Sequence, residues 1–289
     1  MGLDTNRKQR RPALTPQREE ISVQIPERRA GQWIRRLNGD RDRPSRLVCL
    51  PHAGGSASFF LPLASTLSSD VEVLGVQYPG RQDRRLEPMI DSIADLADKV
   101  TEALDGWTDR PTTLLGHSMG ATIAFEVARR LEQRLDNSVV GLIASGRRAP
   151  SIQRGEDNVH LRDDDGLIAE IRTLNGTHGT LLEDEELLRM ILPVVRNDYK
   201  AIETYLFRPG PRLRTPIAVL LGDADPIVTI EEAQAWREQT EAGFGLQTFP
   251  GGHFYLSNDI ENVGGVIAAH IAAFAAGHLT ASLDRPART

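Results

Sequence analysis

Gly116-His117-Ser118-Met119-Gly120 is the stretch of sequence that decides the fold, and it has the form G-x-S-x-G. It follows the apolar run Thr113–Leu115 and precedes apolar residues at helical spacing from Ala121 to Leu131. Glycines on both sides of a serine allow a sharp turn and close packing of a helix on a strand. The stretch therefore predicts a serine lifted clear of the backbone between a strand and a helix.

Outward from this turn, β-type apolar runs alternate with helical patterns, which is typical of a parallel sheet covered by helices. A short strand at Trp33-Ile34 and a turn at Asn38-Gly39-Asp40 come first. The strands that we expect are 47–50, 71–76, 113–115, 139–145, 217–221 and 246–249. The helices that we expect between them are 61–67, 90–104, 119–131, 231–240 and 259–275.

The alternation is interrupted at about residues 147–215, a longer segment than a simple crossover between strands needs. Leu167–Leu174 and Leu187–Leu206 each place apolar residues on one helical face, and Pro193 predicts a kink in the second. Acidic runs at 162–166 and 182–186 are typical of helix starts. The insertion predicts a helical lid over a site, and plain packing against the sheet is the alternative.

Composition predicts one large α/β domain in these 289 residues. We expect residues 1–32 to be a basic, flexible extension, residues 33–289 the main domain, and its tail from about 279 flexible. The net charge is −6, yet residues 1–46 hold twelve Lys or Arg against six Asp or Glu. A basic arm can bind nucleic acid, but no binding motif supports that here, and a solvated leader is the simpler interpretation.

Localisation follows from what the chain lacks. No apolar run appears long enough to span a membrane, and the first twenty residues contain no secretory apolar region. The single cysteine, Cys49, lies in an apolar run and is expected to be a small buried side chain. These features predict a cytoplasmic protein without membrane contact.

A serine hydroxyl becomes a nucleophile only with a base in reach and a group that orients the base. Among seven histidines, only His253 lies in a glycine-rich loop directly after the last expected strand. Loops at this end of the strands bind ligands in open α/β sheets. The acid is expected after the preceding strand, and both Asp223 and Asp225 lie there. We prefer Asp225, followed by the stiff Pro226, and expect Asp223 to hold the local turn.

Two backbone N–H groups are needed for the oxyanion. One is expected from Met119, directly after the serine, and the second from Ala53 in the loop Pro51-His52-Ala53-Gly54-Gly55-Ser56 after an early strand. The chain has no dinucleotide or Walker fingerprint and no Cys/His cluster at metal spacing. We expect no cofactor and no metal.

Five blocks together resemble the type II thioesterases, the discrete editing enzymes of polyketide and nonribosomal peptide assembly lines. They are PHAGGS (51–56), QYPGR (77–81), GHSMGA (116–121), GDADPIV (222–228) and GHFYL (252–256). The resemblance covers about Trp33 to Ala275. It implies an α/β-hydrolase fold with a lid, and a monomer that hydrolyses acyl or aminoacyl thioesters on the phosphopantetheine arm of a carrier protein.

By motif, the resemblance implies Ser118 as nucleophile, Asp225 and His253 as triad partners, and Ala53 and Met119 as oxyanion donors. Tyr78 and Arg81 match the family block without a role that the residues themselves supply. We also hypothesise that Arg147, Arg148 and Arg154 receive the phosphate or an acidic carrier helix, with solvated surface arginines as the alternative.

Two other functions remain open at this point. A carboxylesterase, lipase or acyltransferase would use the same triad, since fold does not fix function. A docking protein with a vestigial site would keep the fold without the activity. The intact order of serine, acid and histidine argues against the second.

Overall fold

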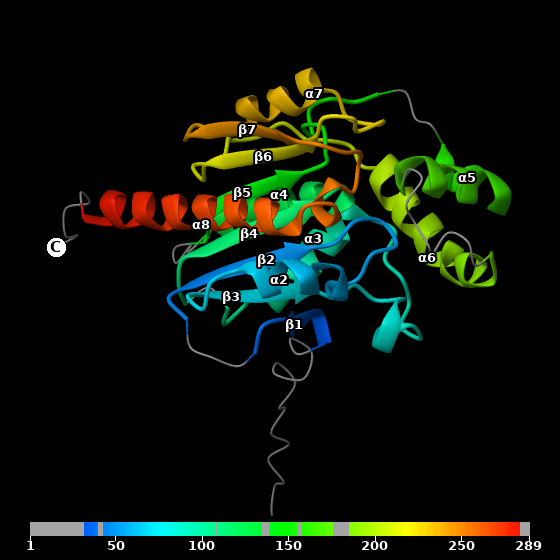
Figure 1. Ribbon diagram of the computed structural model, residues 1–289, viewed down its shortest axis with the longest axis horizontal. Coiled ribbons are helices and arrows are strands. Elements are labelled where there is room, and N and C mark those ends of the chain that lie inside the picture. Colours follow the sequence, from blue (N-terminus) through cyan, green and yellow to red (C-terminus); the bar gives the residue numbers. More distant parts are fainter. Residues whose placement is uncertain are drawn as a thin grey trace, which may run out of the picture.

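Seven strands form one sheet in the computed structural model, which describes residues 32–39, 43–107, 109–134, 139–154, 158–175 and 185–283 (Figure 1). They are β1 (Ile34–Arg36), β2 (Ser45–Leu50), β3 (Val71–Val76), β4 (Thr112–His117), β5 (Val139–Ser145), β6 (Ile217–Gly222) and β7 (Phe244–Phe249). Their order is β1-β3-β2-β4-β5-β6-β7. Only β1 is antiparallel to its neighbour, so the predicted mostly parallel sheet is confirmed.

Alternate residues of each central strand enter two hydrophobic cores, one on each face of the sheet. On β2, Leu47 and Cys49 face one core while Val48 and Leu50 face the other. The first core is covered by α2 (Leu61–Thr66) and α8 (Ile260–Leu283). The second is covered by α3 (Ile93–Ala103), α4 (Met119–Glu132) and α7 (Ile230–Gln234). Cys49 is fully buried, as predicted, and burial raises the pKa of its thiol.

Two helices differ from their predicted bounds, one because of a local cap and the other beside a long-range contact. α3 begins at Ile93 rather than 90 because the Ser92 side chain accepts a hydrogen bond from the Asp95 N–H at 3.3 Å. The helix predicted at 231–240 is α7 followed by the 3₁₀ turn η5 (Ala235–Gln239). In that turn the indole N–H of the buried Trp236 donates to the carbonyl of Arg147 at 2.8 Å, a long-range contact that no local pattern contains.

The insertion between β5 and β6 forms what we call the helical cap, made of η3 (Val159–Leu161), α5 (Asp164–Asn175) and α6 (Glu185–Glu203). It lies beside the sheet, on the right in Figure 1. The helical cap has its own small cluster of buried residues: Val159, Leu167, Ile168, Leu192 and Val195. α6 runs through Pro193, where a kink was predicted, and the expected helix start at 182–184 lies outside the described residues.

The last helix is longer and more apolar than the sequence analysis allowed. α8 continues to Leu283, past the expected start of a flexible tail near 279, because its alanine-rich end favours helix. The expected N-terminal extension, up to residue 31, and residues 284–289 lie outside the described residues. By length and composition alone, Ile260–His278 could cross a membrane, contrary to the expectation that no run could. Val263, Ile267 and Ile271 of this segment pack on the sheet, and a core helix of a soluble protein passes the same test.

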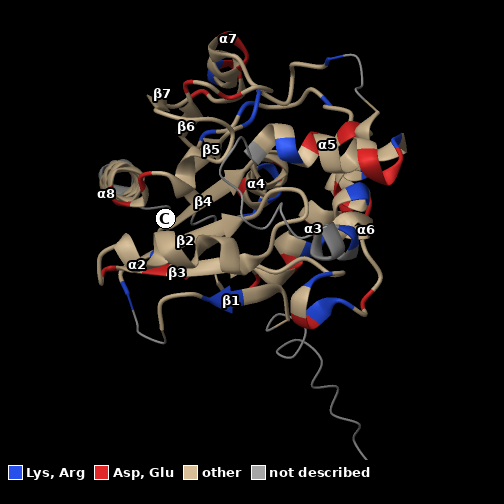
Figure 2. Cartoon of the chain, turned by 45° about the vertical axis from the view of Figure 1, so that its right-hand side comes forward, with Lys and Arg blue, Asp and Glu red and all other residues tan. Residues whose placement is uncertain are grey.

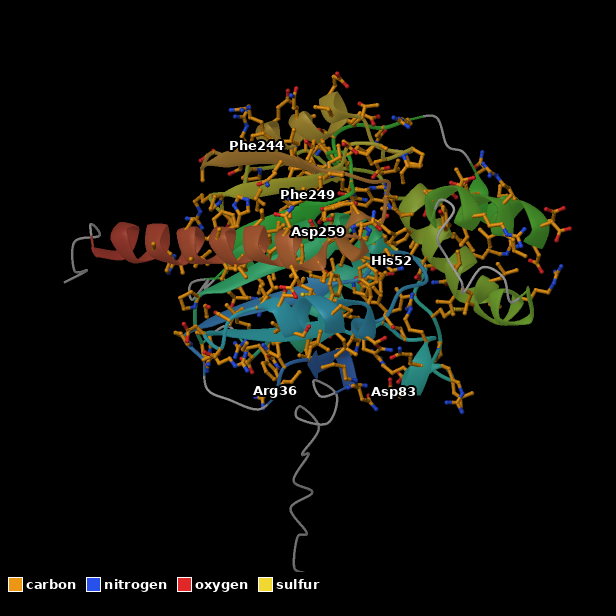
Figure 3. The ribbon with its side chains drawn as sticks, in the orientation of Figure 1. Arg36, His52, Asp83, Phe244, Phe249 and Asp259 are labelled. Atoms are coloured by element: carbon orange, nitrogen blue, oxygen red, sulfur yellow. The ribbon has the colours of Figure 1, made fainter. Side chains whose placement is uncertain are left out.

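Three further 3₁₀ turns of the described residues lie in the loops that follow strands: η1 (Ala57–Phe60), η2 (Gln82–Arg84) and η6 (Tyr255–Ser257). Because β2 and β4–β7 are parallel, the loops after them share one edge of the sheet. Figure 3 places His52, in the loop after β2, at the edge that faces the helical cap.

Candidate functional site

Ser118 occupies the predicted turn between β4 and α4 in a strained backbone conformation, with φ 54° and ψ −121°. A Cβ added at Gly116 would lie 2.2 Å from the Gly120 carbonyl oxygen, so only glycine fits there. The Ser118 N–H donates to the carbonyl of Ser145 at 2.8 Å, which ties the turn to the end of β5. Such strain costs about 1–3 kcal/mol and persists because the surrounding structure enforces it.

His253 and Asp225 are joined by a buried hydrogen bond. His253 Nδ1 lies 2.8 Å from Asp225 Oδ2, and the two side chains are 1% and 0% exposed. The other carboxylate oxygen, Oδ1, accepts the Ile227 N–H at 2.9 Å. A carboxylate at Nδ1 holds the proton on that nitrogen and leaves Nε2 as an acceptor. The other ring nitrogen, Nε2, is buried, and no described residue forms a hydrogen bond with it. Ser118 Oγ therefore does not contact it within hydrogen-bond distance.

Asp223 has the turn-holding contact that was expected of it. Its Oδ1 accepts the Gly251 N–H at 2.9 Å, and its own N–H donates to the Phe249 carbonyl at 2.8 Å. Of the two candidate acids, the structure therefore brings Asp225 to His253 and uses Asp223 to join the loops after β6 and β7.

Two further histidines lie beside this pair: the buried His117 packs against His253, and the half-buried His52 packs against His117. The His117 and His253 ring centroids are 5.1 Å apart, and those of His52 and His117 are 5.9 Å apart. Burial, then the charges of His253 and Arg81, lowers the pKa of His52 to about 3. Burial and the neighbouring histidines also hold the pKa of His117 well below its usual value. Both rings are therefore neutral at pH 7.

His117 belongs to a hydrogen-bonded chain that sequence reasoning missed. Its Nδ1 lies 3.0 Å from Ser145 Oγ, which lies 2.7 Å from the Tyr255 hydroxyl. A Cβ added at Gly146 would lie 2.8 Å from His117 Cε1 and 3.4 Å from His253 Cε1. The only sequence signal for this chain was the position of its members at strand ends and in the block GHFYL.

The two expected oxyanion donors lie on backbone segments that touch. Met119 is the first residue of α4, so its N–H has no partner within the helix. The Pro51–Ser56 loop crosses this first turn closely: a Cβ added at Gly120 would lie 2.1 Å from the Leu50 carbonyl oxygen and 2.7 Å from that of Pro51. The structure thus brings the backbone of the loop that contains Ala53 against the backbone that follows Ser118.

A cavity of about 140 Å³ lies between the helical cap and the loops after β5 and β6. Thr122, one helical turn after Ser118, and Ile227, two residues after Asp225, line it, together with Ile202 and Tyr199 of α6. Arg147 also lines it, and burial, followed by the charge of Arg148, lowers the pKa of Arg147 to about 9. Among the described residues that line the cavity, none is Ser118, Asp225 or His253; Thr122 and Ile227 connect it to them only along the chain.

The three arginines of the carrier hypothesis differ in environment. All three line the cavity, but only Arg154 is exposed, and its guanidinium forms two 2.6 Å hydrogen bonds with the Glu232 carboxylate. The carrier hypothesis stays a prediction. The alternative, solvated surface arginines, fits the exposed Arg154 better than the half-buried Arg147 and Arg148.

The QYPGR block, which had no derived role, supports the loop that contains Ala53. Gln77 Oε1 accepts the Ala57 N–H at 3.0 Å. The Arg81 guanidinium lies over the Tyr78 ring, 5.1 Å from its centroid, and pairs with Asp198 of α6. Tyr78 is fully buried. Sequence reasoning also missed Asp198, because it lies in α6, far along the chain from its partners.

The mostly parallel sheet, the serine turn after β4 and the His–Asp pair after β7 and β6 define the α/β-hydrolase class. A family model described as a thioesterase domain matches residues 45–273, and the chain belongs to that family. Members of the family hydrolyse thioesters, so the chain is a thioester hydrolase.

Similar proteins narrow the family further. The "Probable cadicidin biosynthesis thioesterase" of Streptomyces griseus is 49% identical over 251 residues, 87% of this chain and 69% of its own length. "Thioesterase PikA5" of Streptomyces venezuelae is 47% identical over 243 residues, 84% of this chain and 86% of its own. The solved structure of the type II thioesterase BorB, from the borrelidin biosynthetic cluster, is 51% identical with a TM-score of 0.78, covering 83% of this chain and 97% of BorB. The resemblance to type II thioesterases is confirmed.

Proposed function

We propose that Ser118, His253 and Asp225 form the catalytic triad of this thioesterase. The observation that carries the proposal is the buried 2.8 Å contact between His253 Nδ1 and Asp225 Oδ2, which leaves Nε2 without a hydrogen-bond partner among the described residues. Ser118 and His253 both lie against the end of β5, through the Ser145 carbonyl and Gly146 respectively. Hydrogen bonds between nucleophile and base are often made only when substrate binds.

In the proposed reaction, Ser118 Oγ attacks the thioester carbonyl carbon while His253 Nε2 takes the hydroxyl proton. The N–H groups of Ala53 and Met119 stabilise the oxyanion. The intermediate collapses, the C–S bond breaks, and His253 gives its proton to the leaving thiol, a good leaving group with a pKa of about 8.5. His253 then deprotonates water, which hydrolyses the acyl-serine, releases the acid and regenerates Ser118.

We propose that the substrate is an acyl or aminoacyl group on the phosphopantetheine arm of an acyl or peptidyl carrier protein. Support comes from similar proteins whose names place them in antibiotic assembly, including the "Gramicidin S biosynthesis protein GrsT" of Aneurinibacillus migulanus, 36% identical over 225 residues. The reaction would clear stalled or misprimed chains from a synthase. The acyl group would occupy the cavity beside Thr122, and the helical cap would act as its lid.

Partners and location complete the proposal. Along the described parts of α5 and α6, acidic and basic residues are interspersed rather than grouped by sign (Figure 2). We propose a cytoplasmic monomer that needs neither metal nor cofactor and binds neither nucleic acid nor membrane.

The test is hydrolysis of a panel of acyl groups loaded on a carrier protein, followed by mass spectrometry. The wild type should release the acid, and Ser118→Ala should lose at least about 10⁴-fold in kcat, because triad members act as a unit. Near wild-type turnover by Ser118→Ala would end the proposal. A matched oxygen ester hydrolysed as fast as the thioester would favour an esterase, and transfer to an added alcohol would favour an acyltransferase.

A further inference from the structure

α6 of the helical cap reaches the Pro51–Ser56 loop with one buried carboxylate. Asp198 is 2% exposed, and its Oδ2 accepts the Gly54 N–H at 2.8 Å. One helical turn earlier, Val195 packs on the same glycine: a Cβ added at Gly54 would lie 2.6 Å from Val195 Cγ2. The residue after the expected oxyanion donor Ala53 is therefore held by a segment 144 positions along the chain.

Arg81 makes this buried carboxylate tolerable. Its side chain is 7% exposed; Nη2 donates to Asp198 Oδ2, and Nη1 donates to the Pro79 carbonyl at 2.7 Å. The Arg81 carbonyl accepts a hydrogen bond from Gln77 Nε2 at 3.3 Å. The Oε1 atom of the same amide accepts the Ala57 N–H. A buried charge without its partner is strongly destabilising, so Arg81 and Asp198 stabilise this arrangement as a pair.

Two successive peptide groups of the loop have fixed orientations. The first joins His52 to Ala53, and its carbonyl accepts the Gly55 N–H at 2.9 Å. In a trans peptide the N–H points opposite to the carbonyl, so this bond directs the Ala53 N–H away from the loop's own turn. The second peptide joins Ala53 to Gly54, and Asp198 fixes it. Gly54 has φ +76°, which glycine adopts without strain.

We propose that Asp198 is a positioning residue for the oxyanion hole, acting through the Gly54 N–H on the neighbouring Ala53 N–H. This inference rests on the proposed function, in which Ala53 donates to the oxyanion. It also means that the Pro51–Ser56 loop holds the Ala53 N–H in position only while α6 is packed against it, because Asp198 is part of α6. Other contacts of α6 with the main domain, such as Asn197 Nδ2 to the Ile90 carbonyl at 2.9 Å, hold the helix without touching the loop.

The decisive experiment compares two double variants, Arg81→Met/Asp198→Asn and Arg81→Met/Asp198→Leu. Both lack the guanidinium, so neither buries an unpaired charge, but only Asn keeps an acceptor for the Gly54 N–H. We expect kcat for an acyl-N-acetylcysteamine thioester to be at least about tenfold lower with Leu than with Asn, and KM to agree within about threefold. Thermal unfolding should show similar Tm values.

Asp91→Ala is the matched control. It removes the acceptor of the exposed 2.5 Å pair between Asp91 and Lys200 of α6, a second tether of the same helix that does not touch the loop, and kcat should stay within about twofold. Should the Leu double variant not fold, Arg81→Met/Asp198→Ala replaces it and the same ratio decides. Equal kcat values in the pair would overturn the inference. Failure of the proposed function has a different signature, because the wild type would then leave thioesters intact.

Discussion

The Ser118 turn and the Pro51–Ser56 loop supply the two sides of the proposed site, and they are held in opposite ways. The turn is held by its own neighbours, since Gly116 and Gly120 are in contact four residues apart. The loop is held from a distance, by Gln77 at Ala57 and by Asp198 at Gly54. The nucleophile's geometry is thus encoded in five adjacent residues, whereas the loop's geometry depends on packing of the helical cap.

The largest loss of activity should come from the hydrogen bond between Asp225 and His253. The proposed reaction needs this bond whichever way the turn and the loop are held. Asp225→Asn can donate to Nδ1 and so favours the wrong tautomer, and kcat should fall about 10⁴-fold. Asp223→Asn is the matched control, because the Asp223 side chain accepts the Gly251 N–H and the amide oxygen of Asn can still accept that bond. Steady-state kinetics on a thioester measures both. A similar fall in the two variants would show that the acid was assigned wrongly.

The next largest effect is expected at Gly120, where the turn meets the loop. The added Cβ of Gly120→Ala would lie 2.1 Å from the Leu50 carbonyl oxygen, and backbone cannot yield as a side chain can. The free energy of unfolding in urea should fall by at least about 3 kcal/mol.

Gly265→Ala, in α8, is the comparison for that change. An added Cβ there meets nothing within 4 Å, so alanine should stabilise the helix by up to about 1 kcal/mol. Loss of stability in both variants would point to the general effect of alanine rather than to the crossing of turn and loop.

The same contrast explains what the sequence could predict. Strand and helix periodicity, the turn at Ser118 and the order of Ser118, Asp225 and His253 all follow from short-range patterns and chain order. Arg81 pairs with Asp198, which lies 117 positions along the chain. In the sequence Asp198 is only an acidic residue within a helical pattern, and no spacing rule connects such a residue to a distant loop. His117 lies next to Ser118 in sequence, and no local pattern indicates that it packs beside His253.

One histidine from each region, His52 from the loop and His117 from the turn, makes the stability of the folded protein depend on pH. The pKa values of His52, from the loop, and His117, from the turn, are lowered by burial, so the unfolded chain binds a proton near pH 6.5 that the folded protein does not. Stability is then complete above pH 6.5 and falls as pH drops below it, by about 1.4 kcal/mol per pH unit for each histidine.

His52→Gln and His117→Gln test this dependence through urea unfolding between pH 5 and 7.5. Each should reduce the slope of unfolding free energy against pH, whatever it does to stability at pH 7.5. An unchanged slope in His52→Gln would mean that His52 is protonated in the folded protein or exposed to water.

The smallest expected change in unfolding free energy comes from two glycine substitutions. Comparing them distinguishes backbone strain in the loop from its contact with the helical cap. Gly54 and Gly106 both have positive φ, +76° and +82°, but an added Cβ meets Val195 at 2.6 Å in the first case and nothing within 4 Å in the second. Gly106→Ala should lower the free energy of unfolding by about 1 kcal/mol through strain alone. Gly54→Ala should lower it by about 1 kcal/mol more, because Val195 must move. It should also lower kcat, since moving Val195 displaces Asp198 one turn along α6. Equal losses of stability with unchanged kcat would mean that the loop keeps its shape without the helical cap, and that the two regions are held alike after all.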